Sequence, residues 1–118
     1  MKNIVVYLDV WDVHVAVYVG KFEDAKVWAK SMMKQPQLKE LLDEMALEDE
    51  EKLKTQGITY YLQGGGSFIW LPKFDKGTLV HEMSHSVFHC LDNKGIELNE
   101  ETDEVWGYTM ECLYRKLL

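Results

Sequence analysis

Residues 78–89 read TLVHEMSHSVFH and contain the stretch His81-Glu82-Met83-Ser84-His85, which has the form HExxH. In an α-helix, residues four apart lie one turn apart and differ by about 40° of rotation. On such a helix both imidazoles would point the same way and could donate neutral nitrogens to one metal ion. Glu82 would then be placed to take a proton from a metal-bound water. The competing interpretation is an amphipathic helix with two surface histidines.

The whole chain has the size and composition of one globular domain, which we predict to span residues 1–118. Its formal charge of −7 and its scattered Lys and Arg residues argue against a nucleic-acid partner. No apolar run is long enough to span a membrane, and Asp9 and Asp12 interrupt the only apolar stretch near the start. Cys90 and Cys112 are too few for a disulfide framework, which favours reduced thiols in a cytoplasmic protein.

The pattern of apolar residues predicts the secondary structure. Valine alternates with other residues from Val13 to Val19, as in a strand, and the glycines at 64–66 suit a hairpin turn. Asn99 or Thr102 can cap the last helix. The order of elements predicts an α+β domain, with helices on one side of a small, mostly antiparallel sheet. The predicted strands are 4–8, 13–19, 58–63 and 68–71, and the predicted helices are 21–33, 36 to about 54, 77–91 and the C-terminal segment.

A catalytic zinc site needs three protein ligands and an open position for water, so the motif lacks one ligand. The predicted last helix offers four carboxylates, and its geometry places Glu101 just inside the apolar arc and Glu104 just outside it. The spacing alone does not choose between them. His89 lies two turns after His81, about 80° and 12 Å away, so it is better suited to the core or to support of a ligand. The four carboxylates are Glu100, Glu101, Asp103 and Glu104.

Residues 78–89 resemble the motif helix of gluzincin-type HExxH zinc metallopeptidases. The likeness is closest to the ImmA/IrrE-type domain, and small phage-encoded metallopeptidases are similar. It covers residues 77–118, about a third of the chain. In that family the third ligand is a glutamate on the next helix, followed by an apolar residue and by an aromatic one turn later. The stretch Glu104-Val105-Trp106-Gly107-Tyr108 is similar to that pattern.

The resemblance implies a zincin-like domain in which His81, His85 and Glu104 bind Zn²⁺, with Glu101 as the runner-up. It also implies that residues 68–71 form the edge of the cleft and can pair with an extended substrate. Related gluzincins place an aspartate four residues after the third ligand to orient the first histidine, whereas this chain has Tyr108. The residues that support the metal ligands therefore differ from the family pattern.

Three functions fit these observations. The first is a zinc metallopeptidase that cleaves a protein or peptide substrate, with Glu82 as general base. The second is a catalytically weak or inactive zincin-fold module that binds a protein partner and uses zinc structurally. The third is a metal-free interaction protein. The intact Glu82 favours the first, because a structural site needs no general base. A donor for the oxyanion is required as well, and Tyr60, Tyr61, His89 and Tyr108 are the candidates.

Overall fold

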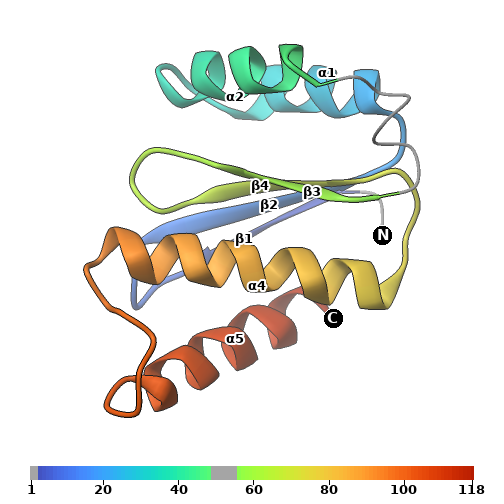
Figure 1. Ribbon diagram of the computed structural model, residues 1–118. Helices are drawn as coiled ribbons and strands as arrows, with labels where there is room; N and C mark the ends of the chain where they lie inside the picture. Colours follow the sequence, from blue (N-terminus) through green and yellow to red (C-terminus); the bar gives the residue numbers. More distant parts are fainter. Residues whose placement is uncertain (1–2, 49–55) are drawn as a thin grey trace.

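The computed structural model describes residues 3–48 and 56–118, which form a four-stranded sheet with helices on both faces (Figure 1). The strands lie in the order β1-β2-β4-β3. Helices α1 and α2 cover one face, and α4 and α5 cover the other. The strands are β1 (Asn3–Leu8), β2 (Val13–Val19), β3 (Ile58–Tyr61) and β4 (Ser67–Leu71); the helices are α1 (Phe22–Met32), α2 (Gln37–Ala46), α4 (Lys76–Asn93) and α5 (Asp103–Leu117).

The sheet is mixed. Strand β1 pairs with β2 and β3 pairs with β4 in antiparallel fashion, whereas β2 and β4 are parallel. The predicted α+β class is confirmed, and two of the three strand pairs are antiparallel as expected. The prediction that the helices lie on one side of the sheet is wrong. The reason is that β4 buries side chains on both faces, so each face needs a helical cover.

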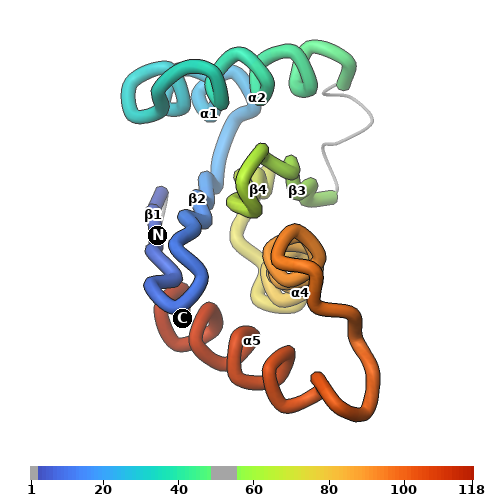
Figure 2. Tube along the Cα trace, turned by 90° about the vertical axis from the view of Figure 1, so that its left-hand side faces the viewer, coloured from blue at the N-terminus to red at the C-terminus, as the bar shows by residue number. Residues whose placement is uncertain are grey.

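Two apolar layers result from the alternation of side chains along the strands. Figure 2, an end-on view, shows the sheet between its two pairs of helices. Val15 and Val17 of β2 and Ile69 of β4 face α4 and α5, where they pack with Met83 and Leu113. The opposite face carries side chains that pack against α1 and α2: Ala16, Phe68 and Trp70 from the sheet, with Phe22, Ala25 and Leu41 from the helices.

Strand β4 is an interior strand, which corrects the prediction that residues 68–71 form the edge of the cleft. It pairs with β2 on one side and with β3 on the other. The edge strand beside α4 is β3. Its residues alternate: Ile58 and Tyr60 face α1 and α2, and Thr59 and Tyr61 lie on the side of α4, where their side chains contact that helix.

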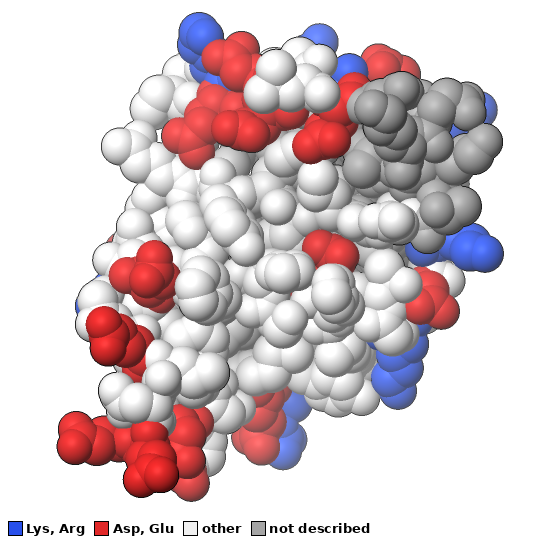
Figure 3. Space-filling model, viewed as in Figure 1, with Lys and Arg blue, Asp and Glu red and all other residues white. Residues whose placement is uncertain are grey.

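The predicted boundaries agree with the structure within a few residues, with one exception. Helix α2 ends at Ala46, and residues 49–54 of the predicted helix lie outside the described residues. No helix in the described parts of the chain is both long and apolar enough to cross a membrane. On the face shown in Figure 3, Asp and Glu gather over α2 and where α5 begins. Few charged residues lie in the band between them, over β3 and the middle of α4.

Candidate metal centre

Helix α4 presents the HExxH motif on a rigid support. Asp75 caps its first turn, because the carboxylate accepts hydrogen bonds from the Thr78 backbone N–H at 2.8 Å and from the Thr78 hydroxyl at 2.7 Å. Leu79, Met83 and Val87, spaced four apart, lie in the core below the sheet. The helix is therefore fixed along one side, and its exposed side carries the motif histidines.

His81 and His85 point toward each other. Their Nε2 atoms are 3.2 Å apart, and the ring centroids are 4.9 Å apart with the planes at 78°. Two nitrogens at 2.0–2.1 Å from one tetrahedral zinc ion would be separated by about 3.3 Å. The pair therefore has the spacing of two ligands on one edge of a zinc tetrahedron. Without a metal, the same spacing allows a hydrogen bond in which one imidazole donates to the other.

Glu82 is buried beside the histidine pair, with 6% of its surface exposed. The Thr59 hydroxyl lies 2.9 Å from Glu82 Oε1 and 3.1 Å from the Glu82 backbone carbonyl, so its proton is shared between two acceptors. The other carboxylate oxygen, Oε2, lies 3.9 Å from His81 Nε2. One oxygen is therefore held by β3, while the other faces the histidines.

Tyr61 connects the end of β3 with the exposed side of α4. Its hydroxyl is 3.4 Å from His85 Nδ1, and its ring stacks on His89 at 4.6 Å with an interplanar angle of 8°. His89 Nε2 lies 2.7 Å from the Leu62 carbonyl, which can only accept, so this nitrogen carries the proton. Burial, and then the negative charge of Glu82, raise the pKa of Tyr61, which keeps its hydroxyl protonated near neutral pH.

A polar cleft of about 450 Å³ opens next to Glu82, at the start of α4. Gly57 forms part of its wall, and a Cβ atom there would lie 2.4 Å from Leu71 Cδ2 and 3.2 Å from Glu82 Cγ. A side chain at this position would therefore require Leu71 to move. The other lining residues are Gln56, Asp75, Gly77, Thr78 and His81.

Strand β3, which follows Gly57, has backbone groups that do not pair with β4. The Leu62 N–H donates to the Gly66 carbonyl at 2.9 Å, which makes this a hydrogen-bonded pair of the β3–β4 hairpin. Such pairs alternate along an antiparallel ladder, so the N–H and C=O of Thr59 and Tyr61 point away from β4. Outside the ladder, these backbone groups form no hydrogen bond with another described residue.

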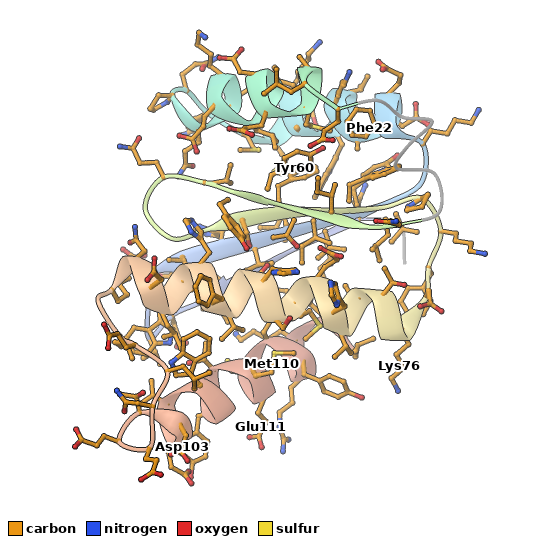
Figure 4. The ribbon with its side chains drawn as sticks, in the orientation of Figure 1. Phe22, Tyr60, Lys76, Asp103, Met110 and Glu111 are labelled. Atoms are coloured by element: carbon orange, nitrogen blue, oxygen red, sulfur yellow. The ribbon has the colours of Figure 1, made fainter. Side chains whose placement is uncertain are left out.

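The structure does not bring Glu104 to the histidine pair. Glu104 lies exposed in the first turn of α5, and α5 runs back along α4 (Figure 4). The rings of Phe88 and Trp106 are 5.9 Å apart, so these two residues lie level with each other. With a rise of 1.5 Å per residue, Glu104 is then about 13 Å further along the helices than His81. Among the residues that the structure describes, no three His, Cys, Asp or Glu side chains form a group that could hold a metal.

The runner-up, Glu101, precedes α5 and lies in the turn that Asn99 stabilises, so it is still further from the level of the pair along the helix axes. By the same estimate of height along the helices, Glu111 is the acidic residue of α5 level with the motif, but Figure 4 shows its side chain on the side of α5 away from α4. Its carboxylate is 3.6 Å from Arg115 Nε. Ligation by Glu104 would require α5 to slide along α4, and that assignment stays a prediction from the resemblance.

Only some of the candidates for the oxyanion donor lie near the histidine pair. Tyr60 is buried and lies on the opposite side of the sheet, toward α1 and α2 (Figure 4). Tyr108 lines a different pocket, between α5 and the β1–β2 turn. Tyr61 and His89 remain beside His85.

The sequence analysis did not identify Thr59 as a residue of the site. The strand pattern of residues 58–61 places Thr59 and Tyr61 on the same face of β3, and this alternation was the available signal.

Comparison with known proteins does not assign the chain to a family. No family model, curated protein or solved structure matches the chain.

Proposed function

We propose that this chain is a zinc-dependent metallopeptidase that hydrolyses a peptide bond in a protein or peptide substrate. One observation supports this most directly: two imidazole nitrogens 3.2 Å apart, with a free carboxylate oxygen of Glu82 3.9 Å from one of them. A surface pair of histidines on an amphipathic helix has no need of a buried carboxylate at that position. The resemblance of residues 78–89 to gluzincin motif helices supports the same function.

His81 and His85 would supply two ligands to the metal, and the resemblance implies Glu104 as the third, which would require α5 to slide along α4. Bound zinc would lower the pKa of its water ligand and polarise the substrate carbonyl. Glu82 accepts the proton of the attacking water on Oε2, while Thr59 holds Oε1, and Glu82 then delivers that proton to the leaving amine. Both steps use the same oxygen, so the carboxylate does not have to rotate between them.

Tyr61 would support this arrangement through His85. With His85 Nε2 turned toward the metal, Nδ1 carries the proton and can donate to the Tyr61 hydroxyl, 3.4 Å away. The stack on His89 and the bond from His89 to Leu62 fix the tyrosine ring. In related gluzincins an aspartate orients the first histidine, at the position where this chain has Tyr108. Here Tyr61 would instead orient the second histidine, His85.

The substrate would bind in extended form along β3. The backbone groups of Thr59 and Tyr61 point away from β4 and form no hydrogen bond with another described residue outside the ladder, so a peptide strand could pair with them and place a carbonyl near Glu82. This assigns to β3 the function that the resemblance had assigned to residues 68–71. The proposed substrate is a peptide rather than a small polar metabolite, because backbone pairing requires a chain.

The test is a cleavage assay on a peptide library prepared from a proteome, with zinc-loaded wild type and zinc-loaded Glu82→Gln. We expect new peptide termini with the wild type and a rate at least about 10²-fold lower with Glu82→Gln, the usual size of a general-base contribution. Zinc content and circular dichroism should be unchanged in the variant. Full zinc binding without any wild-type cleavage would favour the alternative, a zincin-fold module that binds a partner and uses zinc structurally.

A further inference from the structure

The molecule has an apolar pocket of about 260 Å³ between the β1–β2 turn and α5. We call it the α5 pocket. Its apolar wall comes from Leu8, Val10 and Trp11 on one side and from Val105, Tyr108 and Cys112 on the other. None of its lining residues belongs to α4 or β3, so it is separate from the candidate metal centre.

Two of the wall residues are apolar and exposed. Val10 is 78% exposed and Tyr108 is 66% exposed, and they approach the pocket from opposite sides. Single exposed apolar side chains are common on protein surfaces. Two of them on one apolar concavity form a surface that gains free energy when a partner covers it.

Hydrogen bonds hold the pocket in shape. Trp11 Nε1–H donates to the Thr109 hydroxyl at 3.0 Å, and that hydroxyl donates to the Val105 carbonyl at 2.8 Å. In the turn, the Tyr7 hydroxyl donates to the Asp12 carboxylate at 2.6 Å. Asp12 itself adopts a left-handed backbone with φ of 53°. A wall fixed in this way does not have to become ordered when it binds a ligand, which favours affinity.

The surroundings of the pocket are negatively charged. Asp9 lines it, and Asp103 and Glu104 form the first turn of α5, just before the lining residue Val105. Figure 3 shows the concentration of acidic residues where α5 begins. None of these three carboxylates has a Lys or Arg nitrogen within 4.0 Å among the described residues. The basic residues of α5 lie in its last turn.

We propose that the α5 pocket docks a partner protein through an apolar side chain flanked by Lys or Arg residues. The volume favours a single anchoring side chain, since pockets for drug-sized molecules are usually about 300–1,000 Å³. The charge favours a basic flank, because complementary charge steers association and selects the partner. The proposal does not depend on the metal centre and holds whether or not the chain is a peptidase.

Synthetic peptides and thiol labelling test this on the full chain. The probe is a fluorescent lysine-rich peptide with one central phenylalanine. One control peptide has alanine in place of phenylalanine, and another has glutamate in place of lysine. We expect the probe to bind at least about tenfold more tightly than either control, as anchor residues generally dominate docking. It should also slow alkylation of Cys112 by iodoacetamide, with the fully buried Cys90 as an internal reference.

Matched variants locate the binding. Val10→Ser removes an exposed wall residue without disturbing the core, and Val27→Ser is the control, since Val27 is 64% exposed on α1. We expect Val10→Ser to weaken binding of the probe peptide and Val27→Ser to leave its binding unchanged. Equal binding of the phenylalanine and alanine peptides, or of the lysine and glutamate peptides, would overturn the proposal. So would sedimentation showing a dimer that Val10→Ser dissociates, because the pocket would then belong to a second copy of this chain.

Discussion

Thr59→Val removes the hydroxyl that holds Glu82 while nearly keeping the shape of the side chain. In the structure this hydroxyl lies 2.9 Å from a carboxylate oxygen whose side chain is 8% exposed. Hydrogen bonds to charged groups contribute about 1.5–3 kcal/mol to stability. The lower half of that range applies here, because the proton is shared with the Glu82 backbone carbonyl. Valine also favours strands slightly. We therefore expect the free energy of unfolding to fall by about 1–2 kcal/mol.

The measurement is urea unfolding of four proteins: wild type, Thr59→Val, Glu82→Gln and the double variant. Glutamine keeps a hydrogen-bond acceptor but has no charge. The Thr59 hydroxyl should therefore contribute about 1 kcal/mol less to the free energy of unfolding in the Glu82→Gln protein than in the wild type. The two substitutions should therefore be non-additive by about that amount. Strict additivity, or a Thr59→Val protein as stable as wild type, would show that the hydroxyl does not hold the carboxylate. Peptidase activity is not needed for this test.

The other predictions concern the metal centre. Replacing His81 and His85 together by alanine should abolish binding of about one zinc ion per chain, as measured by elemental analysis after dialysis; unchanged zinc content would exclude the pair as ligands. Glu104→Gln should weaken zinc binding at least about tenfold in a competition titration, whereas Glu111→Gln should not; the reverse result would move the third ligand to the acidic residue level with the motif. Gly57→Ala should lower the unfolding free energy by about 1–3 kcal/mol, because its Cβ would lie 2.4 Å from a buried leucine of β4; a neutral effect in urea unfolding would show that the wall can move.

Local patterns of the chain were sufficient to predict several elements. The alternation of valines gave β2, and the spacing of apolar residues around the motif gave α4 to within two residues at each end. The motif itself placed two imidazoles on one side of that helix, as the 3.2 Å distance between their Nε2 atoms confirms. These features depend on residues close in sequence, where helical and strand periods fix direction.

The arrangement of the sheet was predictable only in part. The run Ser67–Leu71 is buried throughout, and a continuous apolar strand is typical of one covered on both faces. That signal pointed to an interior position for β4 and to helices on both faces. The resemblance pointed instead to an edge strand, and the structure corrects it.

What the sequence determined by itself is the chemistry that neighbouring residues can share: two imidazoles and a carboxylate on one helix. What only the tertiary structure decided is which distant residues reach them. Thr59 and Tyr61 lie 23 and 24 residues from the motif residues that they contact, and only the pairing of β3 with β4 brings them there. The position of α5 was likewise beyond the sequence, because packing of Trp106 near Phe88 sets its register along α4. A helical period fixes which face a carboxylate lies on, whereas contacts between helices fix how far along the neighbouring helix it lies.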